Sequence, residues 1–322
     1  MIIDDSKKNN FFINPPRTGI LKKYFDNLIT AKKNVPNYYQ NIEQFKFNKE
    51  LYNFSKKYLE YTSDFDKHAQ ASIPFIFEET MILYYTILKY LNNGGNIISI
   101  DAANGSAERT LVSMSDKIKS LFTTANHSNI EIFKKKPVKN CYYFEGANKD
   151  VLSYIKNNEK ILKIFNDGFD FFIELVGFQM YGKERELPIK YFKQILKKDG
   201  ISIFFEKNSH SSREEFLKRE KQKNELFKTK FFSKQDINEK NKEVLSIMDN
   251  QLVTKEELIA AISKNYKYIV HIWNSGNFNI FVASDNKNNL ERFIKIMPSN
   301  VIDEEFVYEK NLPKIIKGDL KI

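Results

Sequence analysis

The chain has 322 residues, enough for one large domain with an extension, and its 42% hydrophobic and 29% charged residues favour a packed core over a disordered chain. Its single cysteine, Cys141, excludes an intrachain disulfide framework and a cysteine-rich zinc site. Because neither a signal peptide nor an apolar run of about 20 residues is evident, we expect a cytoplasmic protein without a membrane partner.

The net charge of +10 raises the question of a nucleic-acid partner. Lysine is spread over the whole chain and is often interleaved with glutamate and aspartate, so it forms no long basic stripe. This pattern predicts a solvated, lysine-rich surface, and nucleic acid is the less favoured partner.

The first part of the chain, residues 1–95, has a helical pattern. Aromatic and aliphatic residues recur at spacings of three and four, as in the series Leu51, Phe54, Tyr58 and Tyr61. A further helix is predicted over residues 74–91 and stops at Asn92-Asn93-Gly94-Gly95. We therefore expect an N-terminal helical cap.

Beyond this stop, predicted strands alternate with predicted helices. We expect strands at residues 97–100, 120–124, 141–144, 169–175 and 201–206, and helices at 107–119, 129–136, 149–165 and 187–197. Such alternation is typical of βαβ crossovers and of a parallel sheet. A charged, helical segment then covers residues 211–245.

The end of the predicted sheet differs from its beginning. Thr254 and Glu257 have the spacing of a capping box and open a helix that reaches about residue 265. Two apolar segments, 266–273 and 278–283, follow on either side of Asn274-Ser275-Gly276-Asn277, a hairpin signal. The sheet is thus expected to finish in an antiparallel hairpin.

The segment that follows the first strand is the strongest functional signal. It runs Asp101-Ala102-Ala103-Asn104-Gly105-Ser106-Ala107, a strand-ending acid and then small residues that enter a helix. Small residues permit close backbone approach to a ligand, and free N–H groups at a helix start favour an anionic group. We therefore expect a ligand at this carboxyl end of the sheet.

This segment resembles the first motif of the class I S-adenosylmethionine (SAM)-dependent methyltransferases, an acid followed by three alternating glycines. Asp101 matches the acid and Gly105 the middle glycine, while Ala103 and Ala107 replace the outer two. Residues 169–175, the Lys198-Asp199-Gly200 turn before the fifth strand, and the helix and hairpin from Thr254 onward are similar to later parts of that family, in the same order.

The resemblance implies an α/β fold, a seven-stranded class I methyltransferase-like sheet that is parallel except for its antiparallel C-terminal hairpin. The resemblance covers residues 96–285, the expected SAM-binding domain, and is absent from residues 1–95, where the apolar spacing predicts the helical cap. Residues 211–250 would form a helical lid or insertion, and residues 286–322 a C-terminal extension.

It also implies SAM as the cofactor and assigns the site residues. The cofactor's carboxylate would meet the loop of Ala103, Asn104, Gly105 and Ala107. Asp101 would align this loop and the cofactor's sulfonium end, with a helix-entry cap as the alternative. The ribose would lie near Asn126, where many relatives have an acid, the adenine near Ala147 and Asn148, and the methyl group near Glu174 and Leu175.

Two residues are candidate catalytic groups. His210, after the fifth strand, is a candidate general base, with an exposed loop histidine as the alternative. Glu174 ends the fourth strand and either faces the transferred methyl group or caps a loop. The four histidines have no metal-binding spacing, so no metal is expected.

The favoured function is SAM-dependent methyl transfer to a small molecule. Methyltransferases that act on adenine amino groups carry Asn/Asp-Pro-Pro-aromatic at the end of the fourth strand, whereas this chain has Asn14-Pro15-Pro16-Arg17 near its N-terminus, where it predicts a turn. An RNA or protein methyltransferase and an inactive methyltransferase-like binding or scaffold protein are the alternatives. A homodimer through the N-terminal helices is a further open alternative.

Overall fold

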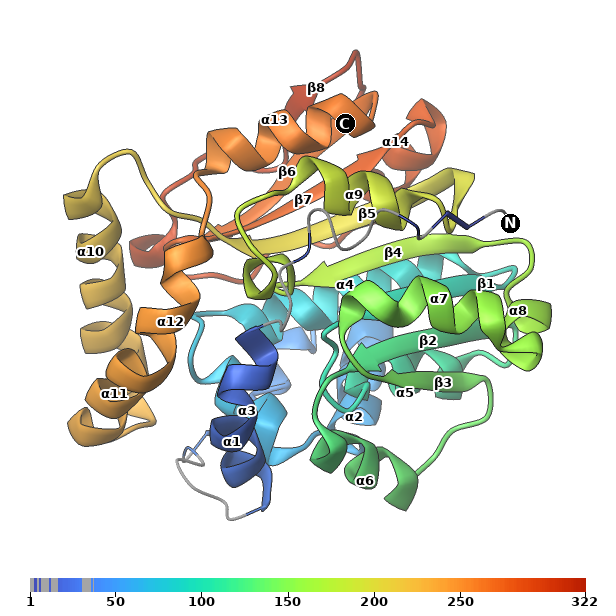
Figure 1. The fold of residues 1–322 in the computed structure, drawn as a ribbon. Coiled ribbons are helices and arrows are strands. Elements are labelled where there is room, and N and C mark those ends of the chain that lie inside the picture. Colours follow the sequence, from blue (N-terminus) through green and yellow to red (C-terminus); the bar gives the residue numbers. More distant parts are fainter. Residues whose placement is uncertain (1–2, 5, 7–11, 13–16, 31–35, 37) are drawn as a thin grey trace.

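The computed structural model describes residues 3–4, 6, 12, 17–30, 36 and 38–322 (Figure 1). The predicted turn at Asn14-Pro15-Pro16 lies outside the described residues. One mixed sheet runs through the molecule, with helices packed on both of its faces.

The sheet has eight strands in the order β3-β2-β1-β4-β5-β7-β6-β8. β1 pairs in parallel with β2 and β4, β2 with β3, and β4 with β5, whereas β7 is antiparallel to both β5 and β6. The first seven strands therefore have the class I methyltransferase arrangement that the sequence predicts. The strands are β1 (Gly95–Ile100), β2 (Ile118–Thr124), β3 (Cys141–Glu145), β4 (Phe169–Leu175), β5 (Leu196–Lys207), β6 (Tyr268–Ser275), β7 (Phe278–Ser284) and β8 (Lys314–Lys317).

Helices cover each face of the sheet because side chains alternate along every buried strand. One face packs on α4 (Ile76–Tyr90), α5 (Ser106–Met114), α6 (His127–Lys135) and α14 (Lys287–Lys295). The other packs on α7 (Val151–Asn157), α8 (Glu159–Ile164), α9 (Glu186–Lys193) and α13 (Lys255–Asn265). Two apolar cores result, one on each side of the sheet.

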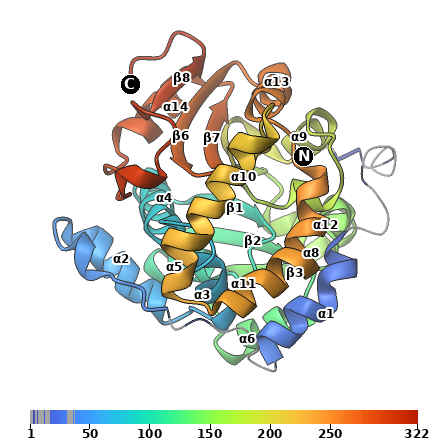
Figure 2. The same cartoon turned by 90° about the vertical axis from the view of Figure 1, so that its left-hand side faces the viewer.

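Two groups of helices lie outside this alternation. The N-terminal group comprises α1 (Arg17–Thr30), α2 (Lys49–Leu59) and α3 (Asp64–Gln70), which precede α4. The second group follows β5 and contains α10 (Arg213–Gln222), α11 (Lys234–Lys240) and α12 (Ser246–Met248), joined by the π-helical turns η5 (Lys223–Phe227) and η7 (Asn241–Leu245). Figure 2 shows α10, α11 and α12 passing in front of the sheet.

Besides shifted ends, such as those of α5, which ends at Met114, and β5, which begins at Leu196, two elements differ from the sequence prediction. The helix predicted over residues 149–165 is broken at Asn158, whose backbone is extended and whose side chain accepts a hydrogen bond from the Ile161 N–H, so that α8 begins anew. The C-terminal extension supplies the unpredicted eighth strand, β8, which is antiparallel to β6. The capping box at Thr254 and Glu257 is confirmed.

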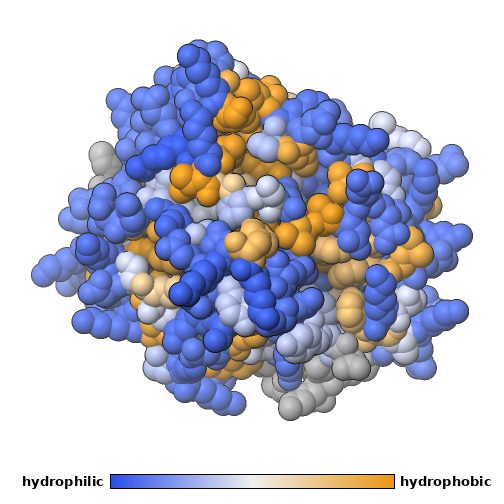
Figure 3. Space-filling model, turned by 180° about the vertical axis from the view of Figure 1, so that it is seen from behind, coloured by the Kyte–Doolittle hydropathy of each residue, from blue (hydrophilic) through white to orange (hydrophobic). Residues whose placement is uncertain are grey.

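The surface carries hydrophobic side chains in several separate patches among hydrophilic ones, as Figure 3 shows for one face. Tyr39 and Phe47, both on the N-terminal part, are exposed to 76% and 66%. The homodimer through this part stays a prediction. Among the described helices, none combines the length and the apolar character that crossing a membrane requires.

Candidate functional site

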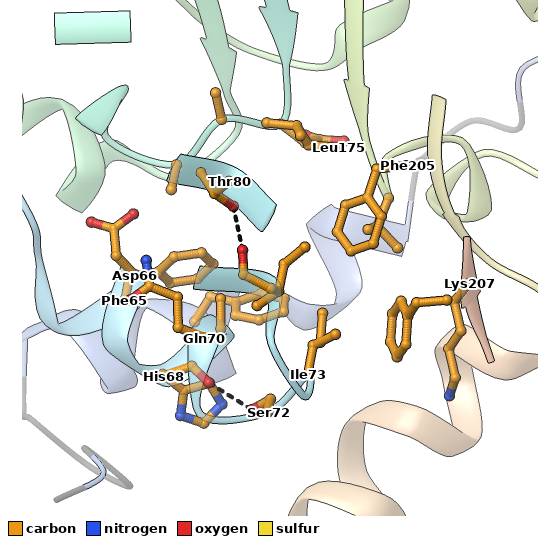
Figure 4. Close-up of a pocket in the computed structure, with 18 of the residues that line it drawn as sticks. Phe65, Asp66, His68, Gln70, Ser72, Ile73, Thr80, Leu175, Phe205 and Lys207 are labelled. Carbon is orange, nitrogen blue, oxygen red and sulfur yellow. Dashed lines mark hydrogen bonds between the residues drawn. The ribbon is translucent and has the colours of Figure 1, made fainter. Parts of the chain in front are cut away.

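A cavity of about 320 Å³ lies at the carboxyl ends of the central strands. Its walls come from the loop after β1, the ends of β2, β4 and β5, the helices α3 and α4, and the helical segment after β5 (Figure 4). In an open α/β sheet, ligands bind at this edge, where the order of the strands reverses, here between β1 and β4. The position of the cavity therefore marks it as the candidate site.

The loop after β1 forms one wall through an unusual backbone. Asp101, Ala103 and Gly105 all have positive φ angles, of 60°, 48° and 68°. A Cβ atom on Gly105 would lie 2.6 Å from the Phe122 ring, so packing against β2 requires this glycine. Of the predicted loop contacts, Asp101, Ala103 and Ala107 line the cavity, whereas Gly105 and the fully buried Asn104 lie behind its wall.

Asp101 is held at the cavity wall by a short chain of hydrogen bonds. Its carboxylate accepts a hydrogen bond from Asn148 Nδ2 at 2.6 Å, and the Asn148 Oδ1 accepts one from the Thr123 hydroxyl. Burial raises the pKa of Asp101 to about 6, against the lowering effect of the Asn148 hydrogen bond. Asn148 is thus engaged within the protein, and neither it nor Ala147 lines the cavity.

Three residues with side-chain amides line the cavity. Asn126 stands at the start of α6, Asn129 in its first turn, and Gln179 after β4. Their carbonyl oxygens are buried and have no hydrogen-bond partner within the part of the chain that the structure describes. Buried acceptors of this kind are normally satisfied, so these oxygens are suited to ligand hydroxyl or amino groups.

The cavity is acidic near the start of α5. Asp66 and Glu108 line it together with Asp101. The Asp66 carboxylate accepts hydrogen bonds from the Ser63 and Ser106 hydroxyls, and Glu108 accepts one from the Tyr84 hydroxyl at 2.7 Å. This end of the cavity therefore suits a cationic group.

Glu174, predicted as a catalytic and cofactor-binding residue, does not line the cavity. Its buried carboxyl group accepts hydrogen bonds from the backbone N–H groups of Gly177 and Phe178. Burial, and then the neighbouring Glu206, raise the pKa of Glu174 well above its usual value. The Glu174 carboxyl group therefore supports the loop after β4 through these two hydrogen bonds, while the adjacent Leu175 lines the cavity.

His210, the other predicted catalytic residue, lies beside the hairpin between β6 and β7. Its Nε2 is 3.2 Å from the Asn277 Oδ1, and the residue does not line the cavity. Burial lowers the pKa of His210. The catalytic roles of His210 and Glu174 stay predictions.

The sequence did not predict the cavity-lining residues that the N-terminal helices contribute. Tyr58, Phe65 and Tyr84 come from α2, α3 and α4, whose apolar spacing is that of ordinary packing helices. It also missed Lys207, Lys223 and Lys228, which line the cavity and are buried, so the expectation of a solvated lysine surface is wrong for them.

Among the residues that the structure describes, no group of three or more His, Cys, Asp or Glu is placed to hold a metal ion.

No protein-family model and no curated protein matches the sequence. Solved structures do show similarity. The plantazolicin methyltransferase BamL, in complex with a triazolic desmethylPZN analog and SAH, is 11% identical, covers 76% of this chain and 100% of its own, and has a TM-score of 0.45. An O-methyltransferase family protein from Burkholderia thailandensis is 10% identical with 84% and 70% covered and a TM-score of 0.42, and spermidine synthase from Thermotoga maritima is 12% identical with 71% and 68% covered and a TM-score of 0.39.

Proposed function

We propose that this protein is a SAM-dependent methyltransferase that acts on a small molecule bound in the cavity. The observation that carries the proposal is the cavity itself, which lies at the carboxyl ends of β1, β2 and β4 in a sheet with the class I methyltransferase strand order.

The residues of the cavity fit SAM in their chemistry. The three free carbonyl oxygens include that of Asn126, which follows β2 where a ribose-binding acid is expected, and an amide oxygen accepts hydrogen bonds from ribose hydroxyls as a carboxylate does. The acidic end formed by Asp66, Asp101 and Glu108 suits the cofactor's ammonium and sulfonium charges. Adenine contacts by Ala147 and Asn148 stay a prediction.

When bound, SAM supplies a methyl group activated by its sulfonium. The chain's own contribution is then to position the acceptor and to exclude water, which suffices when the acceptor is a good nucleophile. Leu175, Val176 and Met180 form an apolar wall beside the acidic end, where displacement of water strengthens the electrostatic interactions.

Residues 211–250 are proposed as a cover over the acceptor side of the cavity. Support comes from the lining residues that this segment contributes, among them Lys223, Val244, Leu245 and Met248. An acceptor enclosed in this way is a small molecule, and enclosure argues against the RNA and protein alternatives.

The test is calorimetric titration of the protein with SAM and with S-adenosylhomocysteine (SAH). We expect micromolar binding that Asn126→Leu weakens at least about fivefold, because a ribose hydroxyl then loses its acceptor. His127→Ala is the matched control, since this neighbouring side chain is 57% exposed. Absence of binding by the folded wild type would refute the proposal and favour the inactive binding or scaffold alternative.

A further inference from the structure

Four lysines line the cavity on the side of the helical segment that follows β5. Lys207 ends β5, Lys223 begins η5, Lys228 follows η5, and Lys240 ends α11, and all four line the cavity. Figure 4 shows Asp66 and Lys207 at opposite sides of the cavity, with Ile73 and Phe205 between them. From Asp66 to Lys207 the cavity thus changes from an acidic side, through an apolar middle, to a basic side.

Two carboxylates partly neutralise the basic side. Lys207 lies 3.1 Å from Glu220 and 2.8 Å from Asp249, and Lys223 lies 2.7 Å from Glu220. The four lysines outnumber these two carboxylates, which among the four contact only Lys207 and Lys223. An uncompensated charge in a buried site is costly, and a bound anion would relieve that cost.

Lys240 is held by contacts with His68 and Ser72. Its Nζ is 2.7 Å from the His68 Nε2 and 2.8 Å from the Ser72 hydroxyl. Burial, and then the charges of Lys228 and Lys223, lower its pKa well below the usual value. The contacts of Lys240 therefore join the segment after β5 to α3.

Among these four lysines, Lys228 has no polar or charged partner for its ammonium group in the part of the chain that the structure describes. It is only 1% exposed, and within the described residues it makes neither a hydrogen bond nor an ion pair. Lysine is almost never fully buried unless paired. Because Lys228 lines the cavity, its ammonium group is available only to something bound there.

The segment that carries these lysines has irregular helical turns at the points where they occur. Lys223 begins the π-helical turn η5, and η7 begins directly after Lys240. Single π-helical turns inside α-helices are frequent at functional sites because they redirect side chains. The irregularity is therefore a second feature that indicates a ligand on this side.

We propose that the basic side of the cavity, with Lys228 as its free cation, binds the anionic head group of the acceptor, a carboxylate or a phosphate. The apolar middle, lined by Phe205, Phe278 and Ile280, would hold the acceptor's hydrocarbon or aromatic body. This inference rests on the proposed function, since it names the acceptor class of the same site: a small amphipathic acid.

The experiment titrates the full chain with four probes that share a phenyl ring: 3-phenylpropionate, phenyl phosphate, the neutral 3-phenylpropanamide and the cationic 3-phenylpropylamine. We expect at least one acid to bind and the amide and amine to bind at least about tenfold more weakly. The more tightly bound acid identifies the head group. Lys228→Met and Lys228→Gln should each weaken acid binding by about tenfold or more, whereas Lys230→Met, which removes an exposed lysine from the same short helix, should not.

SAH titrated into the same samples separates the two proposals. If the protein binds SAH but binds the acid and the amide with equal affinity, the proposal of an anionic acceptor is refuted and the methyltransferase proposal stands. Acid binding that depends on Lys228 without SAH binding supports the anion site and refutes the methyltransferase. Acid binding that survives both Lys228 substitutions overturns the assignment to this lysine.

Discussion

Replacing Lys228 with methionine should stabilise the folded protein, because the wild type keeps an unpartnered cation 99% buried at that position. Methionine has a similar length and leaves no charge to desolvate. Burial, followed by repulsion from Lys223, lowers the pKa of Lys228 from 10.5 to about 7. At about 1.36 kcal/mol per pKa unit, this shift corresponds to at most about 5 kcal/mol of folding free energy.

The stability difference should depend on pH in a defined direction. Below pH 7, Lys228 is charged in both the folded and the unfolded chain, so the full cost of burying it is present. Between about pH 7 and 10.5 the folded chain has lost this proton and the unfolded chain still holds it, so wild-type stability rises with pH. The advantage of Lys228→Met should therefore be several kcal/mol at pH 6 and much smaller at pH 9.5.

Urea unfolding of wild type, Lys228→Met and the control Lys230→Met at these two pH values measures the effect. The control should match wild type within about 0.5 kcal/mol at both pH values, because its lysine is exposed. A Lys228→Met variant less stable than wild type, or a difference that stays the same at pH 6 and 9.5, would refute the idea that Lys228 is a buried and unsatisfied cation.

Two further predictions concern buried acids. Both carboxyl oxygens of Glu79 are buried without a hydrogen-bond partner in the described structure, and burial raises its pKa from 4.5 to about 8, so the folded chain holds a proton that the unfolded chain releases. As the pH rises from 5 to 8, the free energy of unfolding of the wild type should therefore fall relative to that of Glu79→Gln by up to about 1.4 kcal/mol per pH unit. Urea unfolding measures this difference, and parallel pH curves for the two proteins would contradict the prediction. Glu174→Gln should leave stability and SAH binding nearly unchanged because glutamine still accepts from the Gly177 and Phe178 N–H groups, whereas Glu174→Leu should cost about 2 kcal/mol or more. Loss of methyl transfer in a stable, SAH-binding Glu174→Gln variant would instead support the predicted catalytic role.

The sequence predicts most of the sheet because its strands are apolar, short and separated by clear stop signals. β1 follows the stop at residues 92–95, and the hairpin between β6 and β7 has its turn at Gly276, as its asparagine and glycine content indicates. The strand β8 could not be predicted, since its four residues, Lys314–Lys317, lie at the sheet edge and show little apolar alternation. The break at Asn158 was missed because the apolar spacing continues across it.

The candidate site was predictable only where it coincides with the sheet. The acid and small residues of the loop after β1 place Asp101, Ala103 and Ala107 at the cavity. In contrast, the sequence gives no sign that Asn148 is engaged with Asp101, because this contact joins distant segments. It also gives no sign that the Glu174 carboxyl group accepts hydrogen bonds from the N–H groups of Gly177 and Phe178 in the loop that follows it. The orientation of Lys223 and Lys228 was hidden for a different reason: helical periodicity assumes 3.6 residues per turn, and η5 departs from it.

The π-helical turn η5 also makes the position of Lys228 sensitive to chain length. A π-helical turn accommodates one residue more than the α-helical turn it replaces, so deleting one residue within Lys223–Phe227 would restore regular α-helix. Every side chain beyond the deletion would then rotate by about 100° around the helix axis. Lys228 would turn away from the cavity without any lysine being substituted, so insertions and deletions in this segment could alter acceptor choice while the sheet stays the same.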